Sequence, residues 1–314
     1  MPMPGPEPIQ YYHRYTGRME TEPVYGEAWL RWTYETAPGK LFLRLVVRHP
    51  VFSKFSGWWM DRSVTRKRIP GFVDRYGIDA SEFVDRLDAF PNFNSFFARR
   101  LRRENRPVDP EPGHAVFPAD GRHLGFPDLS VVQSVFVKGQ RFDLTALLGD
   151  AEAARRYASG ALVLSRLCPI DYHRFHYPVS GVAGAPRDIR GSLYSVNPVA
   201  LRRNLGYLWQ NRRFVTRMQS DLFGEVLLME IGATCVGSIV QTRPAGGPVA
   251  KGLEKGYFRF GGSSVLTFFE PGRIELASDL AEHTGAGKEL YAHMGDVMGR
   301  SSGMETEAHL RQQA

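Results

Sequence analysis

Cysteine is scarce in this chain: the 314 residues contain two, Cys168 and Cys235, which lie far apart in apolar runs. Two isolated cysteines provide neither a disulfide framework nor the ligand spacing of a structural zinc site. Single buried cysteines usually behave as small hydrophobic core residues, and we expect this of both. The scarcity therefore excludes a disulfide-stabilised secreted domain and favours a reducing compartment.

Long hydrophobic runs are absent as well. The most apolar stretch, 41–47, is interrupted by Arg44 and falls well short of the roughly 18 residues that a membrane-spanning helix requires. The first eight residues are rich in proline and lack the apolar segment of a signal peptide. We therefore expect no transmembrane helix and no secretion signal.

Signatures of nucleic-acid binding are missing too, since there is no paired Cys/His spacing and no aromatic motif of RNA-binding strands. The chain is nevertheless basic, with a formal net charge of +7 and an isoelectric point of about 9.5. Such a charge favours an anionic partner. Because no motif supports nucleic acid, we expect the partner to be an anionic membrane surface.

Three regions are predicted along the chain: a flexible arm at 1–24, a helical region at 25–106 and a β-rich core at 107–314. In the core, short runs rich in β-branched and aromatic residues alternate with Gly, Pro and Asp, which is typical of a sandwich or barrel. These runs are 131–137, 161–164, 225–231, 238–241 and 264–269. We therefore expect an α+β protein with a β-rich sandwich or barrel-like core and a helical N-terminal region.

The helical region contains an aromatic and basic segment at 41–68. Its apolar residues recur at spacings of three, four and seven, which places most of them on one side of a helix, and Pro50 interrupts the pattern. Trp58 and Trp59 precede the basic cluster 66–68. The combination predicts a helix pair that lies in a membrane interface. An amphipathic helix packed on its own domain is the alternative, and we favour the membrane.

Arginines gather just before the β-rich core. They are Arg99, Arg100, Arg102, Arg103 and Arg106. A cluster of this kind is able to face phosphate groups, and a solvated charged face is the alternative for each arginine taken singly.

The loop 261–264, Gly-Gly-Ser-Ser, has a chemical as well as a structural interpretation. A serine hydroxyl that follows a glycine can attack the preceding carbonyl, because glycine adds no side-chain bulk and accepts strained backbone angles. Elimination from the resulting ester would convert the serine into a pyruvoyl group. Such loops are usually flexible turns. Self-cleavage would in addition require a base that takes the serine proton and an acid that orients the base, both from elsewhere in the chain.

Candidates for both groups lie upstream. His173 and His176 are three residues apart in a polar and aromatic segment, where both could point into one cleft. The pair alone also fits a metal site or two solvated side chains, but no third ligand accompanies it at the usual spacing, and we expect no metal. Asp120 is the candidate acid, although an aspartate before a glycine is most often a turn residue.

Several segments, taken together, resemble the signatures of the phosphatidylserine decarboxylase family. They occur in this order: 93–97, 118–121, 171–178, 230–239, 251–258, 261–264 and 291–295. The resemblance covers roughly residues 80–300, and the agreement of so many segments in order distinguishes it from chance.

The resemblance implies that Asp120, His176 and Ser263 form a self-processing triad. Asp120 would orient His176, and His176 would take the proton of the Ser263 hydroxyl. Cleavage between Gly262 and Ser263 would produce a β chain that ends at Gly262 and an α chain that begins with a pyruvoyl group made from Ser263. His173 matches the family's second histidine, which is implicated in substrate handling and proton transfer. The pyruvoyl cofactor would serve as an electron sink.

The resemblance further implies conversion of phosphatidylserine to phosphatidylethanolamine and CO2 at a membrane surface. The expected partners are an anionic phospholipid membrane, the chain's own α and β products and a second processed unit in a homodimer. The expected location is the cytoplasmic face of the cell membrane, as a peripheral protein. One alternative is a related pyruvoyl-dependent decarboxylase that acts on a free amino acid or another amino-phospholipid. The other is a non-enzymatic membrane-associated β protein in which 261–264 is merely a turn.

Overall fold

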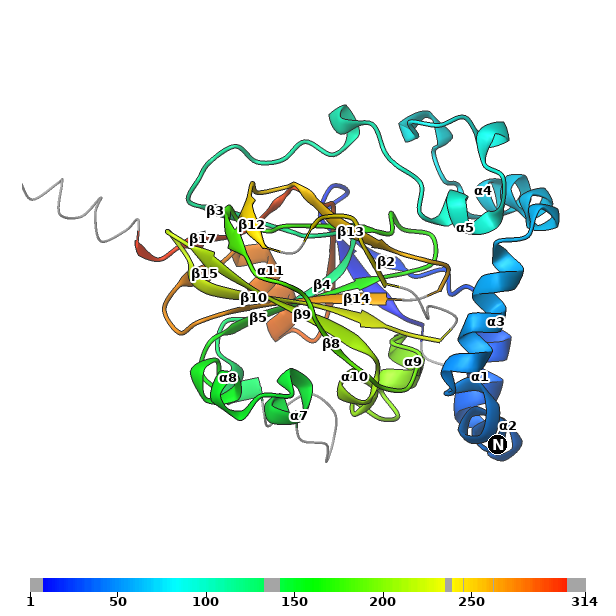
Figure 1. The fold of residues 1–314 in the computed structure, drawn as a ribbon, viewed down its shortest axis with the longest axis horizontal. Helices are drawn as coiled ribbons and strands as arrows, with labels where there is room; N and C mark the ends of the chain where they lie inside the picture. Colours follow the sequence, from blue (N-terminus) through cyan, green and yellow to red (C-terminus); the bar gives the residue numbers. More distant parts are fainter. Residues whose placement is uncertain (1–7, 133–141, 235–238, 245, 262, 304–314) are drawn as a thin grey trace, which may run out of the picture.

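A large sheet of 11 strands forms the centre of the molecule (Figure 1). The structure is a computed structural model, and it describes residues 8–132, 142–234, 239–244, 246–261 and 263–303. The strands of the large sheet are, in spatial order, β12 (Gly247–Val249), β7 (Gly181–Ala183), β9 (Arg213–Ser220), β10 (Gly224–Gly232), β14 (Ser263–Phe269), β5 (Ala161–Leu167), β4 (Gly121–Phe126), β16 (Glu289–Ala292), β1 (Gln10–His13) and β2 (Arg18–Thr21), with β8 (Arg187–Ile189) paired to β9. All neighbours are antiparallel except β1 and β16, which are parallel.

Two sheets of three strands accompany the large one. They are β11 (Ile239–Gln241), β13 (Glu254–Phe258) and β6 (Arg174–His176), and β15 (Ile274–Leu276), β17 (Val297–Ser301) and β3 (His114–Val116). A buried cluster joins Leu167 and Val265 of the large sheet to Phe175 and Phe258 of the first small sheet. This small sheet therefore packs on one face of the large sheet, next to β14 and β5.

The helices are short. They are α1 (Glu27–Glu35), α2 (Ala37–Phe42), α3 (Pro50–Met60), α4 (Ile69–Tyr76), α5 (Phe93–Phe97), α6 (Leu129–Val132), α7 (Leu144–Leu148), α8 (Ala151–Arg156), α9 (Pro198–Leu201), α10 (Tyr207–Gln210) and α11 (Ser278–Gly285). The prediction of a protein with mixed helices and strands is confirmed, and a large β-sheet dominates it. Among the described residues, none of the helices has the length and hydrophobicity needed to cross a bilayer.

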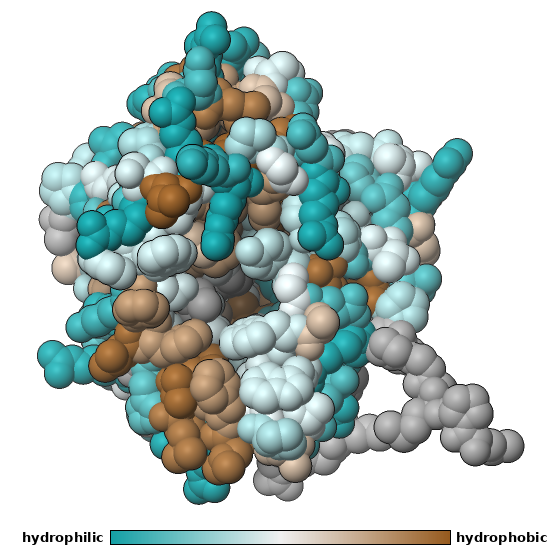
Figure 2. All heavy atoms as spheres, turned by 90° about the vertical axis from the view of Figure 1, so that its right-hand side faces the viewer, coloured by the Kyte–Doolittle hydropathy of each residue, from teal (hydrophilic) through white to brown (hydrophobic). Residues whose placement is uncertain are grey.

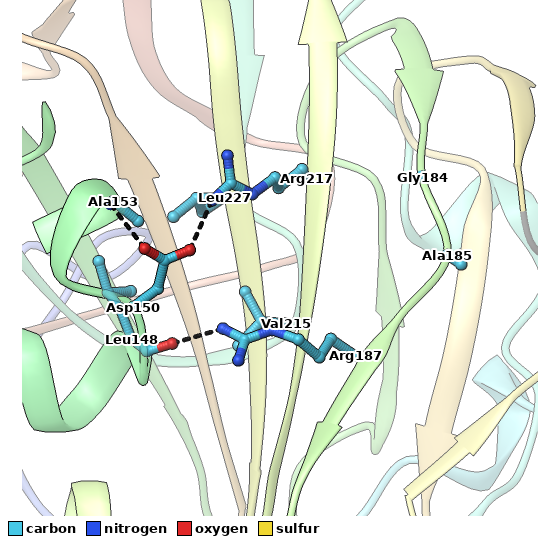
Figure 3. A pocket seen from close by; sticks show the side chains of 9 residues that line it. All are labelled: Leu148, Asp150, Ala153, Gly184, Ala185, Arg187, Val215, Arg217 and Leu227. Atoms are coloured by element: carbon cyan, nitrogen blue, oxygen red, sulfur yellow. Dashed lines mark hydrogen bonds and ion pairs between the residues drawn. The ribbon is translucent and has the colours of Figure 1, made fainter.

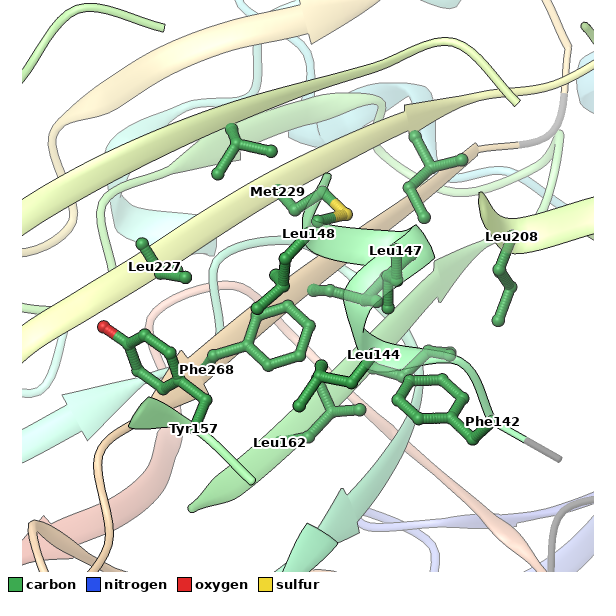
Figure 4. Packing of buried hydrophobic residues seen from close by; sticks show 14 of the residues in the cluster. Phe142, Leu144, Leu147, Leu148, Tyr157, Leu162, Leu208, Leu227, Met229 and Phe268 are labelled. Atoms are coloured by element: carbon green, nitrogen blue, oxygen red, sulfur yellow. The ribbon is translucent and has the colours of Figure 1, made fainter. Parts of the chain in front are cut away.

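The pleat of β14 separates its side chains between two buried layers, because successive residues of a strand point to opposite faces. Leu266 and Phe268 pack with α7, α8 and α10 in the largest hydrophobic cluster (Figure 4). Val265 instead packs against the small sheet. Burial of each such large apolar side chain contributes roughly 1.5–3 kcal/mol to folding, so β14 is held firmly from both sides.

The N-terminal segment joins the sheet in its described part. Residues 10–21 form the antiparallel pair β1 and β2, and β1 pairs with β16 near the other end of the chain. This part of the expected arm at 1–24 is therefore a sheet edge. The following Glu22 is buried and forms an ion pair with Arg166 of β5 at 2.6 Å. This ion pair anchors the chain shortly before α1.

Helices α1 to α5 pack against one end of the sheet (Figure 1). Leu30 and Val47 are buried in one cluster, and Met60 and Phe93 in another. Pro50 begins α3, where its missing N–H is not needed. Part of the amphipathic pattern at 41–62 is therefore explained by packing within the protein.

Candidate functional site

Ser263 is the first residue of β14, where it lies between Gly232 of β10 and Leu167 of β5. It is completely buried, and its Oγ has no hydrogen-bond partner within the described part of the chain. Gly262, the other side of the predicted cleavage bond, lies outside the described residues, as does Cys235. Gly261 has a φ of +138°, a conformation that favours glycine.

The strand pleat distinguishes Ser263 from Ser264. Ser263 and Val265 share a face of β14, and Val265 contacts the cluster that contains Ala119 and Phe175. These two residues are the immediate neighbours of Asp120 and His176 in the sequence. Ser264 points to the opposite face. Of the two serines, Ser263 is the one whose face of β14 packs against the small sheet that contains β6.

His176 ends β6 and is 5 % exposed. Its backbone N–H donates to the Pro118 carbonyl at 2.8 Å, which joins the histidine strand to the segment that carries Asp120. The ring Nδ1 is buried, and no hydrogen-bond partner for it occurs among the described residues. Burial lowers the pKa of His176 to about 4, although the charges of Glu254 and Asp120 act in the opposite direction. The imidazole is therefore neutral at physiological pH and able to accept a proton.

His173 has a fixed tautomer. Its Nδ1 lies 2.9 Å from the carbonyl oxygen of Asp171, and because a carbonyl only accepts, Nδ1 carries the proton and donates. Nε2 is then an unprotonated acceptor, and it has no hydrogen-bond partner in the described residues. The centroid of the His173 ring lies 3.8 Å from that of Phe97, with the two rings tilted by 37°. Burial lowers the pKa of His173 to about 3, although the Asp171 carbonyl and the backbone of Gly261, which lies beside the ring, act in the opposite direction.

Asp120 is buried at the start of β4, but its direct partners differ from the expected one. Arg106 Nε donates to both carboxylate oxygens, at 3.0 and 2.8 Å, and the Met294 N–H donates at 2.9 Å. Within the residues that the structure describes, no hydrogen bond joins Asp120 to His176. The carboxylate acts on His176 through its charge, which raises the pKa of the imidazole.

The arginine cluster is only partly a surface feature. Arg106 is buried and also pairs with Glu82, so neither of the two expectations for this side chain, phosphate or solvent, holds. Arg99 is buried as well, and its Nη2 donates to the carbonyls of Ile170 and Asp171 at 3.0 and 3.1 Å. Both arginines face inward because they neutralise or cap groups around the histidine segment.

Both the carboxylate and the backbone carbonyl of Asp171 accept hydrogen bonds. Arg122 Nη1 contacts its carboxylate oxygens at 2.6 Å, and the Cys168 N–H donates to Oδ2 at 2.6 Å. Its carbonyl oxygen accepts from both Arg99 and His173. This fixed residue sets the position of the His173 ring.

An apolar cavity of about 320 Å³ reaches Gly261 from the N-terminal helices. Tyr25, Trp29 and Met60 line its outer part, and Phe260 lines it beside Gly261. A second cavity, of about 300 Å³, lies beside α7 and α8 (Figure 3).

Neither cavity is lined by Asp120, His173, His176 or Ser263. In the second, Arg217 pairs with Asp150 at 2.8 Å, and Arg187 donates to the Leu148 carbonyl at 2.7 Å (Figure 3). The first reaches Gly261, two residues before Ser263, and is the better candidate for a substrate.

Comparison with known proteins shows the family. The sequence profile described as phosphatidylserine decarboxylase matches residues 93–298. The chain belongs to the phosphatidylserine decarboxylase family. The profile includes Asp120, both histidines and Ser263, and it ends within β17. The resemblance inferred from the sequence motifs is thereby confirmed.

Relatives within the phosphatidylserine decarboxylase family match almost their whole length. A protein of Chlamydia caviae is 43 % identical over 93 % of this chain and 98 % of its own. One from Desulfitobacterium hafniense strain Y51 is 42 % identical, with the same coverage. One from Clostridium perfringens is 40 % identical, over 93 % of this chain and 99 % of its own. Each is named phosphatidylserine decarboxylase proenzyme, which describes a precursor that is processed.

Proposed function

We propose that this phosphatidylserine decarboxylase cleaves itself between Gly262 and Ser263 and uses the resulting pyruvoyl group to decarboxylate phosphatidylserine at a membrane surface. The observation that carries the proposal is the Ser263 hydroxyl: it is completely buried, it has no partner among the described residues, and it lies on the face of β14 that packs against the small sheet containing β6. A buried hydroxyl without a partner costs free energy. Ser264 is buried and unpartnered too within the described chain, but it lies on the opposite face of β14, so we assign the chemical role to Ser263.

The self-processing step conserves all atoms. His176 accepts the proton of Ser263 Oγ, which attacks the carbonyl carbon of Gly262; the peptide C–N bond breaks as His176 passes the proton to the Ser263 nitrogen, and an ester forms. Loss of the Ser263 Cα proton and departure of the Gly262 carboxylate end the β chain. Addition of one water and release of ammonia then leave a ketone on the former Ser263.

Each residue of the triad has a defined task in this proposal. His176 holds the proton, since burial keeps its imidazole neutral beforehand. Asp120 stabilises the imidazolium that forms, through its charge and not through a direct hydrogen bond. Arg106 and the Met294 N–H hold the carboxylate in place.

The site fits a pyruvoyl group, because the only atoms it requires are those of Ser263 in an enclosed position. A pyruvoyl ketone supplies an electron sink for loss of CO2 from an amine-bearing carboxylate. His173 is proposed to move the proton of the product: its Nδ1 is anchored, and its unprotonated Nε2 would take a proton from the substrate ammonium group and return it to the product carbon. The apolar cavity beside Gly261 would exclude water from the carboxylate, which favours its departure.

The N-terminal helices are proposed to lie on an anionic membrane. Hydrophobic side chains gather at the lower end of the face in Figure 2, over α1, α2 and α3. The exposed ones are Trp29, Trp32, Leu41, Leu45, Val46, Val51, Phe55, Trp58 and Trp59. Such a patch is uncommon on a soluble protein and typical of an interface. It adjoins the cavity that reaches Gly261, so a lipid head group would have a short path to the site.

Replacement of Trp58 and Trp59 by serine is expected to weaken binding to vesicles of anionic phospholipid at least tenfold. The two side chains are 49 and 41 % exposed, and tryptophan gains free energy at head-group depth. Vesicle flotation measures the loss. Leu222→Ser, in the turn between β9 and β10 and 42 % exposed, is the matched control. Equal binding by both variants would show that α3 does not contact the membrane, and no binding by the wild type would favour a free amino acid as substrate.

Self-processing is expected to keep a constant rate from pH 8 to about 5.5 and to slow as the pH approaches 4. The pKa of His176 is lowered to about 4, so the imidazole stays unprotonated above that value. The precursor, made by cell-free synthesis and stopped in denaturant at intervals, gives the rate on gels. A midpoint near 6.5 would contradict the burial of the base.

Loss of folding stability at low pH limits the measurement of the processing rate. Because the folded pKa lies below the ordinary value of about 6.5, the contribution of His176 to stability is complete above that pH and declines as the pH falls. Circular dichroism at each pH therefore selects the samples that are folded.

The intact mass of the purified protein tests the proposal as a whole. Two polypeptides of about 29 and 6 kDa are expected, the shares of the 35.4 kDa chain on either side of the bond, with the smaller one lacking the serine nitrogen. A single 35.4 kDa species from the wild type would refute self-processing. From the family resemblance we also propose a homodimer of processed units at the cytoplasmic face of the cell membrane; light scattering of the purified protein measures its size.

A further inference from the structure

Asn94 connects the short helix α5 to the backbone that leads into the proposed cleavage bond. The side chain is 4 % exposed, and its Oδ1 accepts a hydrogen bond from the Phe260 N–H at 2.9 Å. Phe260 is followed by Gly261, Gly262 and then Ser263. None of the roles assigned above to the triad or to His173 involves this asparagine, although it lies in the signature segment 93–97.

The other end of the same amide is bound to α3. Nδ2 donates to the Gly57 carbonyl at 3.1 Å and to Asp61 Oδ1 at 3.0 Å. The orientation of the amide follows from its partners, since the Phe260 N–H can only donate whereas a carbonyl and a carboxylate accept. Asn94 therefore uses three hydrogen bonds to join α3 and the segment before Ser263.

Packing supports the same connection. The Phe260 ring lies 5.3 Å from Phe93 and 5.2 Å from Phe97, both on α5. Arg259 forms an ion pair with Asp61 at 3.1 Å, which adds a second, exposed link to the end of α3. The chain is thus fixed at Phe260 on one side of the glycine pair and at β14 on the other.

We propose, on the basis of the proposed self-processing, that Asn94 is the positioning residue that fixes the backbone at Phe260 so that Ser263 Oγ can attack the bond before it. Two consecutive glycines leave the backbone with many accessible conformations. An anchor on the residue just before them reduces this freedom, and the rate of an intramolecular attack depends steeply on such positioning. The same contacts connect the proposed membrane helix α3 to the bond that is cut.

A positioning role and a merely structural role of Asn94 predict different effects on self-processing and on decarboxylation. After cleavage, Asn94 and Phe260 both remain in the β chain, whereas the pyruvoyl group begins the α chain. The anchor is needed to bring the two sides of the bond together, and this task ends when the bond is broken. Loss of Asn94 should therefore slow processing far more than it slows decarboxylation by the molecules that have been processed.

Asn94→Ala is the variant that tests this. We expect processing of the cell-free precursor to slow at least tenfold, whereas decarboxylation per pyruvoyl group, counted by mass spectrometry, stays within about twofold of the wild type. Ser95→Ala is the matched control: it removes the Ser95 half of the capping box of the same helix but leaves the Asn92 cap and the Phe260 contact, and it should process within about twofold. Wild-type processing by Asn94→Ala, or an equal loss in both reactions, would overturn the proposal.

An exchange of the two polar partners provides the second variant. Asn94→Asp with Asp61→Asn keeps an acceptor for the Phe260 N–H and a donor–acceptor pair at the end of α3, but it removes the donor to the Gly57 carbonyl and the carboxylate that pairs with Arg259. If circular dichroism shows that Asn94→Ala is unfolded, the double variant is measured instead, provided that it folds. A processing rate within about threefold of the wild-type rate supports the proposal. A tenfold slower rate contradicts it. Absence of processing in the wild type itself would refute the proposed function, and the two failures are thereby distinguishable.

Discussion

Ser263→Ala is expected to leave the chain as one species near 35.4 kDa with no decarboxylase activity. The hydroxyl is both the proposed nucleophile and the source of the ketone, so its removal eliminates the cut and the cofactor together. The site should otherwise remain intact, because Ser263 Oγ makes no hydrogen bond within the described chain. Thermal stability should therefore be unchanged or slightly increased. Denaturing gels, intact mass and release of CO2 from labelled phosphatidylserine measure the three effects.

Ser264→Ala is the matched control for this experiment. The residue is adjacent, equally buried and also without a hydrogen-bond partner in the described part of the chain, but it lies on the opposite face of β14. We expect two fragments and substantial activity from this variant. Cleavage of Ser263→Ala, or an uncut Ser264→Ala, would show that the reacting serine has been assigned to the wrong face.

Substitution of the two histidines is expected to separate the two reactions. His176→Asn should slow self-processing by ~10²–10⁴-fold, the usual contribution of a general base. His173→Asn should still be cut, and should lose decarboxylation by a comparable factor, because its proposed role begins only after the ketone exists. The asparagine keeps a polar side chain of similar reach in each case. Time courses on gels give the first rate, and CO2 release per processed chain gives the second.

The opposite result would assign self-processing to His173 and decarboxylation to His176. His173 has a fixed tautomer with an available Nε2. Its contact with Phe97, which itself packs on Phe260, and its interaction with the Gly261 backbone place it near the segment before the cut. If His173→Asn blocks cleavage and His176→Asn does not, the base for self-processing is His173. The charge of Asp120 on His176, together with the link from His176 to Pro118, favours the assignment made here.

Local sequence patterns predicted much of the fold. The short β-rich runs at 161–164, 225–231 and 264–269 correspond to β5, β10 and β14, since an apolar composition bounded by turn residues is a property of a few consecutive positions. The expected run at 131–137 falls partly on α6 and partly outside the described residues. The pairing of β1 with β16 had no local signal, because the two strands are separated by almost the whole chain.

The sequence by itself determined the family, the reaction class and the types of residue required, because these follow from short segments in a fixed order. Only the tertiary structure decided which partners those residues have. Arg106 on Asp120 and Asn94 on Phe260 join positions 14 and 166 residues apart. Such contacts depend on how whole strands and helices pack, so no periodicity or motif along the chain reveals them.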